Sequence, residues 1–220
     1  MDLNHLKRLV REGEGEHIEF KKKITDPLKV AKEVVAFANG TGGFLIMGVT
    51  DDGIISGMKD PEGELYLMEE VLGLRCKPKV AYHIHRIPLN HKQKVIVLEV
   101  EEHQRKPVFL IYNLKSKRGK AYIRVADKSV QMSKVVRMIL KEQGRDRIQG
   151  FSYGAYESAL LQYVNEHGQA TLMDFIKSVG CSEEDAIEVF VRLTVSNVLD
   201  VRPNEVQDTF ILKESEEEGL

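Results

Sequence analysis

Apolar and polar positions in the first 140 residues switch between the spacing of helices and that of strands. Leu3, Leu6 and Leu9 recur at helical spacing, whereas residues 17–21 alternate as in a strand. Further helices are predicted at 27–39, 65–74 and 135–140, and strands at 44–49, 80–87, 94–101, 108–112 and 121–125. We expect the last two strands to pair around a basic loop. The pattern predicts an α+β fold, with helices packed on a mixed or antiparallel sheet.

Local sequence marks two helix ends and one turn in this part. Asp26-Pro27 combines a capping side chain with a first-turn proline, which predicts a helix start. Asn39-Gly40 predicts a left-handed stop at the end of the same helix. Asp52-Gly53 predicts a tight hairpin turn after the buried strand 44–49.

The pattern changes after residue 150. Helices are predicted at 156–166, 172–179 and 183–195, followed by a small hairpin formed by 199–201 and 209–212. Three helices and a hairpin are typical of a small winged-helix-like α/β domain. We therefore expect a first domain at 1–145, a winged-helix-like domain at 151–213 and an acidic tail at 214–220.

Charge is distributed unevenly between these parts. The net charge is −2, but residues up to Gly150 include 28 Lys and Arg against 20 Asp and Glu, and the remainder includes 4 against 14. A basic domain favours a polyanionic partner. The third helix of the acidic part begins with Glu183, Glu184 and Asp185, which would repel phosphates. For that part we favour a protein contact or dimerisation over DNA binding.

Several function classes are disfavoured by the sequence. No run is long and apolar enough to cross a membrane, and residues 1–10 lack the features of a signal peptide, so we expect a cytoplasmic protein without a membrane partner. Cys76 and Cys181 are isolated, which disfavours a disulfide framework and a structural zinc site. His83 and His85 share one strand face, but no third metal ligand accompanies them.

Residues 40–43 form a glycine-rich turn with two interpretations. The backbone amides of Gly40, Gly42 and Gly43 could hold a phosphate. The turn, however, follows a helix and precedes a strand, which is the reverse of the nucleotide-binding order. The alternative is a helix stop with a close-packed entry to the buried strand.

Three carboxylates form the second candidate site. Glu14, Glu19 and Asp51, with Asp52 as a neighbour, could bind Mg²⁺ or Mn²⁺, because hard cations prefer carboxylate oxygens. The alternative is that Glu14 belongs to a solvated acidic turn and Asp51 to a hairpin turn. No cofactor is certain from the sequence.

Basic side chains form the third candidate site. The phosphate contacts that we expect are Lys21, Lys22, Lys115, Lys117, Arg118, Lys120 and Arg124. Four of them lie on the loop between the strands predicted at 108–112 and 121–125, although a lysine-rich loop is also ordinary for a protein surface. The chain has no Trp, which disfavours a dedicated base-stacking platform.

Taken in order, several short motifs resemble the Schlafen-type AlbA-like domain over roughly residues 5–140. They are Glu14, Glu19-Phe20-Lys21, Ala36-Phe37-Ala38-Asn39, Gly42-Gly43, Gly48-Val49, Asp51-Asp52-Gly53, Gly57, Pro107 and Tyr122-Ile123-Arg124-Val125. The resemblance implies a DNA-binding domain of the kind that often precedes a winged-helix part in bacterial transcriptional regulators. It also implies nuclease residues, because the vertebrate branch cuts tRNA and rRNA with three carboxylates that match Glu14, Glu19 and Asp51.

Some features depart from the family pattern. The common Asn-Thr-x-Gly-Gly appears here as Asn39-Gly40-Thr41-Gly42-Gly43, and the Gly-Ser that often follows Arg-Val is Ala126-Asp127. The vertebrate proteins clamp RNA between two such lobes, so a homodimer would have to supply the second lobe here. We therefore expect a nucleic-acid-binding regulator or accessory factor rather than an enzyme. The alternatives are a metal-dependent endoribonuclease and an assembly factor that binds an acidic protein.

Overall fold

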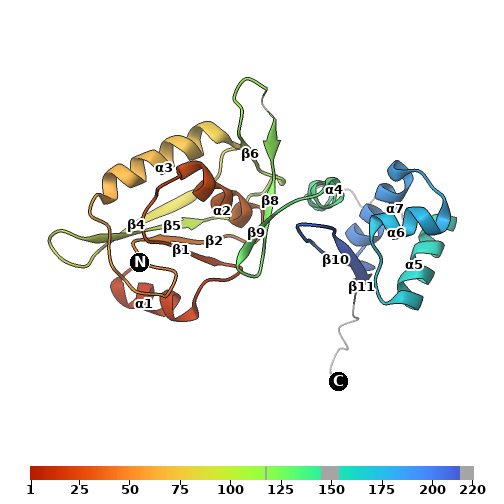
Figure 1. Cartoon of the computed structure of the whole chain (residues 1–220), viewed down its shortest axis with the longest axis horizontal. Helices are drawn as coiled ribbons and strands as arrows, with labels where there is room; N and C mark the ends of the chain where they lie inside the picture. Colours follow the sequence, from red (N-terminus) through yellow and green to blue (C-terminus); the bar gives the residue numbers. More distant parts are fainter. Residues whose placement is uncertain (117, 145–153, 214–220) are drawn as a thin grey trace. The chain divides into compact units, whose positions relative to one another are not determined.

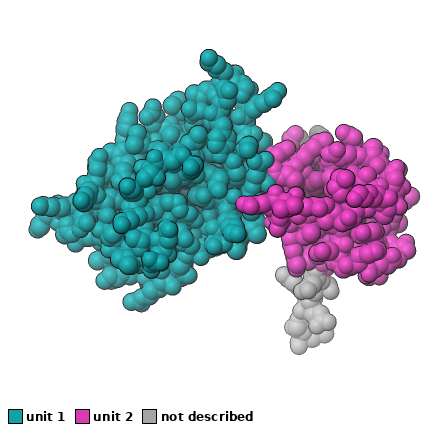
Figure 2. Space-filling model, viewed as in Figure 1, with its two compact units in different colours: residues 1–131 teal, residues 132–220 magenta. Residues whose placement is uncertain are grey.

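The computed structural model describes residues 1–116, 118–144 and 154–213. The chain divides into two compact units, Met1–Gln131 (unit 1) and Met132–Leu220 (unit 2) (Figure 2). Unit 1 carries 23 Lys and Arg against 18 Asp and Glu, and unit 2 carries 9 against 16. The two units therefore have opposite net charge, as the sequence indicated. Within the described residues, no helix has the length and apolar character needed to cross a membrane.

Unit 1 is a mixed α+β structure (Figure 1). Its elements are α1 (Leu3–Glu12), β1 (Ile18–Lys21), α2 (Pro27–Asn39), β2 (Gly43–Met47), α3 (Pro61–Arg75), β3 (Cys76–Lys77), β4 (Tyr82–Pro88), β5 (Lys94–Val100), β6 (Phe109–Ile111), β7 (Gly119–Lys120), β8 (Tyr122–Val125) and β9 (Lys128–Gln131). The α+β class that the periodicity predicted is confirmed.

The main sheet of unit 1 has the strand order β1-β2-β5-β4. β1 and β2 are parallel, with α2 as their crossover, and the other pairs are antiparallel. One face packs on α1 through a cluster that includes Leu6, Phe20 and Val97, and the other packs on α2 and α3 through Phe37 and Leu98. Because both faces are covered, β1, β2 and β5 are largely apolar, and any charge on them must find a partner inside the protein.

The strands after β5 pair differently from the prediction. The run expected at 121–125 does not pair with 108–112. Instead β6 pairs with β3 and β7, and β8 forms its own hairpin with β9. The hairpin closes directly through a two-residue turn at Ala126-Asp127, with Val125 opposite Lys128. A two-residue turn pairs a strand with its immediate successor, so β8 has a nearer partner than β6.

The turn at Ala126 supplies a test of this hairpin. Ala126 has φ 53°, in the left-handed region where a Cβ is unfavourable and where the family pattern places glycine. We expect Ala126→Gly to raise the free energy of unfolding by about 1 kcal/mol, because the strain is relieved. Urea denaturation of the two proteins measures the difference. A destabilised Ala126→Gly protein would contradict this account of the turn.

The two predicted ends of α2 have different outcomes. Asp26 caps the helix as expected, since its carboxylate accepts the N–H of Lys29 at 3.1 Å. Gly40 does not adopt the left-handed conformation; its φ is −85°, and the positive φ of 87° falls at Gly42. The Asn39 side chain is instead buried, where it donates to the Val108 and Tyr122 carbonyls and accepts the Val108 N–H. Asn39 therefore anchors α2 to the strands that follow Val108.

The described residues of unit 2 form four helices and a hairpin. Its elements are α4 (Lys134–Gln143), α5 (Ala155–His167), α6 (Leu172–Val179), α7 (Glu183–Val195), β10 (Leu199–Arg202) and β11 (Thr209–Leu212). The three helices and hairpin have the predicted order. We expected α4 in the first domain, but its Val135 and Ile139 belong to the core of unit 2 with Phe190. The division between the units therefore falls after Gln131 rather than near residue 145.

Candidate functional site

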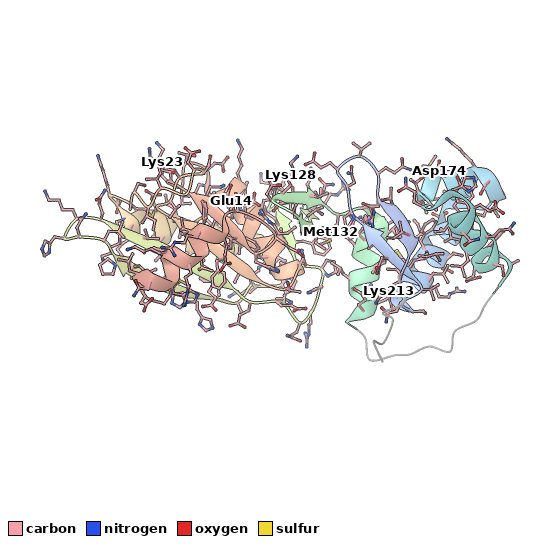
Figure 3. All side chains as sticks on the ribbon, turned by 90° about the horizontal axis from the view of Figure 1, so that it is seen from below. Glu14, Lys23, Lys128, Met132, Asp174 and Lys213 are labelled. Carbon is pink, nitrogen blue, oxygen red and sulfur yellow. The ribbon has the colours of Figure 1, made fainter. Side chains whose placement is uncertain are left out.

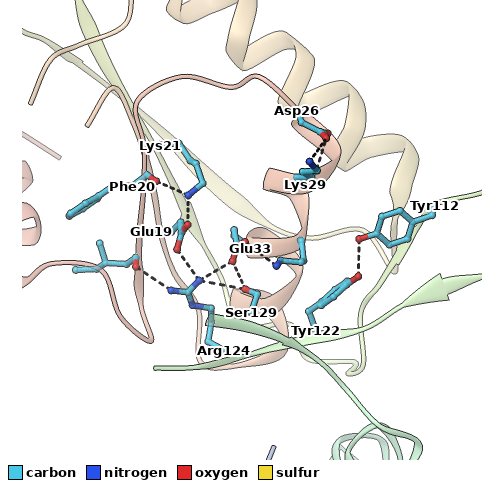
Figure 4. A network of polar contacts seen from close by, with 12 residues as sticks. Glu19, Phe20, Lys21, Asp26, Lys29, Glu33, Tyr112, Tyr122, Arg124 and Ser129 are labelled. Atoms are coloured by element: carbon cyan, nitrogen blue, oxygen red, sulfur yellow. Dashed lines mark hydrogen bonds and ion pairs between the residues drawn. The ribbon is translucent and has the colours of Figure 1, made fainter. Parts of the chain in front are cut away.

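A buried ion-pair network lies between β1, α2 and the β8–β9 hairpin (Figure 4). One guanidinium nitrogen of Arg124 (Nη1) donates to Glu19 and to Glu33, each at 2.9 Å. The other (Nη2) donates to the Gly15 carbonyl at 2.5 Å. Ser129 on β9 completes the network by donating its hydroxyl to Glu33. The Arg124 side chain is only 2% exposed, so these contacts replace water at Nη1 and Nη2, whereas its buried Nε has no hydrogen-bond partner.

Arg124 was predicted to contact phosphate, and its position corrects that prediction. A buried guanidinium that is already held by two carboxylates cannot reach a phosphate on the surface. It lies over the Phe37 ring at 5.2 Å from the centroid, which further fixes its plane. The residue that sequence reasoning missed is Glu33. It stands between Val30 and Phe37 on the apolar stripe of α2, and a lone carboxylate there signals a buried cation.

Glu19 and Lys21 are also engaged within the protein. Glu19 is buried, and its second oxygen accepts the Lys21 ammonium, which also donates to the Phe20 carbonyl at 2.9 Å. Glu19 therefore balances Arg124 on one side and Lys21 on the other. Lys21, at the end of β1, is half-buried and has little freedom to contact a nucleic acid. Lys22 and Lys23, on the loop that follows β1, are exposed.

The three carboxylates predicted as a catalytic site come near one another. Loss of surrounding water raises the pKa of Glu14, although its carboxylate accepts the Phe20 N–H at 2.8 Å. The neighbouring carboxylates of Glu19 and Asp51 raise that pKa further. Glu14 lies on the surface of unit 1 (Figure 3), and Asp51 is exposed in the turn after β2. Among the described residues, no three His, Cys, Asp or Glu side chains gather in a way that could hold a metal ion.

The glycine-rich turn serves the packing of the chain. Gly40 donates its N–H to the Ala36 and Phe37 carbonyls, and Gly42 donates to Phe37. A Cβ at Gly43 would lie 2.5 Å from the Phe37 ring, and one at Gly42 would lie 2.7 Å from the Val100 carbonyl. The amides of Gly40 and Gly42 are thus turned to the protein and are not free to hold a phosphate, which favours the helix stop with a close-packed strand entry.

Among the other predicted phosphate contacts, Lys115, Arg118 and Lys120 belong to the β6–β7 hairpin of the β3–β6–β7 sheet. Residues 75–80 and 108–120, which we call the basic sheet surface, carry seven Lys and Arg and no Asp or Glu. Lys115, Arg118 and Lys120 are exposed there, while Lys117 lies outside the described residues. The hairpin that carries them stands out from the rest of unit 1 (Figure 1). Such a surface presents cations without a competing carboxylate.

Local contacts shape the loop of this hairpin. The Asn113 side chain accepts the N–H groups of Lys115 at 2.9 Å and Ser116 at 3.3 Å, as in an Asx turn. The Lys120 ammonium lies 6.0 Å from the centroid of the Tyr112 ring. These contacts order the backbone and one ammonium before any ligand arrives, which lowers the entropy lost on binding.

The two histidines on β4 are explained by cross-strand pairs. His83 lies 2.9 Å from Glu101, which directly follows β5, and His85 lies 2.6 Å from Glu99 on β5. Opposite charges on neighbouring strands stabilise a sheet when the histidines are protonated. Each imidazole therefore already has a carboxylate partner, the exposed His83 as well as the half-buried His85.

Comparison with known proteins identifies the first part of the chain. No protein with a curated description matches it. Among solved structures, the DIP2311 protein from Corynebacterium diphtheriae matches with 18% sequence identity and a TM-score of 0.41, over 90% of this chain and 34% of that one. This chain thus spans about a third of the length of that relative. The family described as Schlafen, AlbA_2 matches residues 14–133, which is more than half of the 220 residues. The chain therefore belongs to the Schlafen, AlbA_2 family.

Proposed function

We propose that this protein binds nucleic acid through unit 1, by contacts between backbone phosphates and the basic sheet surface. The observation that carries the proposal is the set of exposed cations Lys115, Arg118 and Lys120 in a region without any carboxylate. Lys22 and Lys23 offer further phosphate contacts on the loop after β1. Contacts of this kind give affinity without sequence preference. Membership in the AlbA_2 family supports the proposal.

The role of unit 2 follows from its charge. Its 9 Lys and Arg against 16 Asp and Glu make it a poor partner for phosphates, and α7 begins with three acidic residues. Together with the hairpin β10–β11, its helices have the order of a winged-helix domain. We propose that this unit mediates assembly, either of two copies or with another protein. The whole chain would then act as a transcriptional regulator or a related accessory factor.

Binding and cleavage are read in one experiment. Purified protein is incubated with labelled tRNA and with labelled duplex DNA, in Mn²⁺ or in EDTA, at several salt concentrations. Retarded, intact strands whose retardation fades as salt rises would support the proposal, because phosphate contacts release counterions. Retardation that is absent at low salt, or unchanged by salt, would argue against it.

A metal-dependent endoribonuclease is the second candidate. The observation that favours it is the proximity of Glu14, Glu19 and Asp51, which raises the pKa of Glu14. Against it, both oxygens of Glu19 are taken by cations of the protein, so the three side chains do not fit a metal ion as they stand. The nucleic-acid-binding module is therefore the function that the geometry supports best.

In the incubation with tRNA we expect the RNA to remain intact in Mn²⁺ as well as in EDTA. The reason is that Arg124 and Lys21 occupy both oxygens of Glu19, which leaves neither for a metal ion. The discriminating variant is Asp51→Asn, since Asp51 is exposed and its change leaves the buried network intact. Glu12→Gln is the matched control, since it also neutralises an exposed carboxylate of unit 1. Cleavage that needs Mn²⁺, is lost in Asp51→Asn and persists in Glu12→Gln would establish the nuclease. Glu19→Ala is unsuitable, because it would also leave Arg124 short of a partner.

A further inference from the structure

The basic sheet surface contains an apolar cavity in addition to its cations. The cavity has a volume of about 620 Å³ and lies between the end of α3 and the hairpin β6–β7. It is lined by Leu74, Lys77, Phe109, Ile111, Leu114 and Gly119. Volumes of this size, with a mostly apolar lining, are typical of ligand pockets.

Part of this lining is open to solvent. Leu74 is 51% exposed and Leu114 is 48% exposed, although both side chains are fully apolar. Leu67, two turns earlier on the same side of α3, is also exposed, with Glu70 between the two leucines. A contiguous apolar patch with a polar rim marks an interaction site more often than an ordinary surface.

The rim of the cavity selects the charge of its ligand. Lys77 lines the cavity, and Lys115, Arg118 and Lys120 are exposed on the adjoining hairpin. No carboxylate occurs in residues 75–80 or 108–120 that would repel an acidic ligand. The nearest acidic residues along the chain are Glu69 and Glu70 on α3, and Glu70 lies one turn before Leu74, so the cationic rim ends on that side of the cavity. A complementary partner is therefore acidic around an apolar centre.

A nucleic acid and an acidic peptide both fit this description, and the lining of the cavity distinguishes between them. A nucleobase presents donors and acceptors at its edges that need polar partners when they leave water. Apart from backbone, the cavity offers only the Lys77 ammonium, and its other side chains are Leu, Ile and Phe. Such a lining suits a Leu, Met or Phe side chain better than a base.

We propose that the cavity and its cationic rim are a docking site for an acidic peptide segment of a partner protein, which inserts a large apolar side chain between Leu74 and Leu114. Carboxylates on either side of that anchor pair with Lys77, Lys115 and Arg118. Since these cations include the phosphate contacts of the proposed function, the bound segment competes with nucleic acid. Only this competition rests on the proposed function; docking itself does not.

Docking is tested with the full-length protein and a panel of fluorescein-labelled, Asp- and Glu-rich peptides of about twelve residues. Each carries two Leu or Phe residues at spacings of two, three or four positions, the spacings that share one face of a strand or a helix. Matched peptides carry Ser at those positions. In anisotropy titrations we expect saturable binding by apolar members of the panel and at least tenfold weaker binding by their Ser counterparts.

Two variants locate the binding. Leu114→Asp is expected to raise the Kd of the bound peptides at least tenfold, because it puts a carboxylate at the mouth of the cavity. Ile54→Asp is the matched control, since Ile54 is an exposed apolar residue elsewhere on unit 1, and it should leave the Kd unchanged. Both positions are exposed, so both variants should keep the circular dichroism spectrum of the parent protein.

Four results would overturn the proposal. One is that no member of the panel binds, and another is that the Ser peptides bind as well as the apolar ones. A third is that Leu114→Asp weakens binding of an oligo-dT strand but of no peptide, which would assign the cavity to a base. The fourth is a concentration-dependent dimer that Leu114→Asp abolishes while no peptide binds, which would assign the face to a second copy. Because the titration contains no nucleic acid, its result is independent of whether unit 1 binds DNA or RNA.

Discussion

Replacing Arg124 by Ala is expected to lower the free energy of unfolding of unit 1 by about 3–5 kcal/mol, because it leaves buried carboxylates without their cation. Glu19 and Glu33 each lie 2.9 Å from one guanidinium nitrogen, and the Gly15 carbonyl loses its donor at the same time. Urea denaturation followed by circular dichroism measures the loss. Hydrogen exchange of peptides from unit 1 and unit 2 shows which unit is affected.

Three further variants separate the charge from the side-chain volume. Lys128→Ala, in the same hairpin but exposed, should change the free energy by no more than about 0.5 kcal/mol. Arg124→Lys should be intermediate, since one ammonium cannot match the planar fork of donors. Adding Glu19→Gln and Glu33→Gln to Arg124→Met should recover part of the loss, because no bare charge stays buried. A loss below about 1 kcal/mol in Arg124→Ala would show that water, rather than protein, solvates these carboxylates.

The elements whose structure follows from local sequence were predictable. The helical spacing of Leu3, Leu6 and Leu9 yields α1, and the Asp26 cap sets the start of α2. Ser182 caps α7 in the same way by accepting the N–H of Asp185 at 3.1 Å. In each case the deciding interaction spans three or four residues, so the information lies within one window of sequence.

The strand pairing was not predictable in the same way. The apolar runs 108–112 and 121–125 are equivalent as sequence patterns, and only the turn at Ala126-Asp127 decides that the second one pairs with β9. Similarly, the periodicity of α4 shows an apolar stripe but not which core receives it. Its Val135 and Ile139 join unit 2, beyond the boundary that composition indicated. Choices between distant partners depend on the assembled core and are therefore invisible in a short window.

The candidate site shows the same difference between what local sequence predicts and what depends on distant contacts. The sequence shows which side chains are charged, and it predicted that Lys115, Arg118 and Lys120 lie together after the run 108–112. They do lie together, on the hairpin β6–β7, although the run predicted to close that loop pairs with β9. The sequence does not show which charges are cancelled inside the protein. Arg124 and Lys21 pair with Glu19 and Glu33, of which Glu33 lies 91 positions from Arg124. The motif residues Glu19 and Arg124 thus hold β1 and β8 together, and the free cations for a ligand lie elsewhere.

Neutralising the three exposed cations of the hairpin is expected to change the salt dependence of nucleic-acid binding. In the variant Lys115→Gln, Arg118→Gln, Lys120→Gln, the slope of log K against log[salt] should fall in magnitude by about 3 for duplex DNA, close to one unit for each phosphate contact. At 0.05 M salt, lost counterion release of that size lowers the affinity by up to about 10³-fold. Electrophoretic retardation at four or five salt concentrations gives both quantities.

A matched variant distinguishes contacts from net charge. The matched triple variant is Lys7→Gln, Arg8→Gln, Arg11→Gln. It removes an equal number of positive charges, but from exposed positions on α1, which covers the face of the main sheet opposite α2 and α3. If the hairpin cations bind phosphates directly, the α1 variant should keep the parent slope, because slope counts the counterions released at the interface. Equal changes in the two variants would mean that unit 1 attracts nucleic acid through its overall field rather than through this surface. In that case nucleic-acid binding would not depend on the hairpin cations, and peptide docking would be the one role proposed for the basic sheet surface.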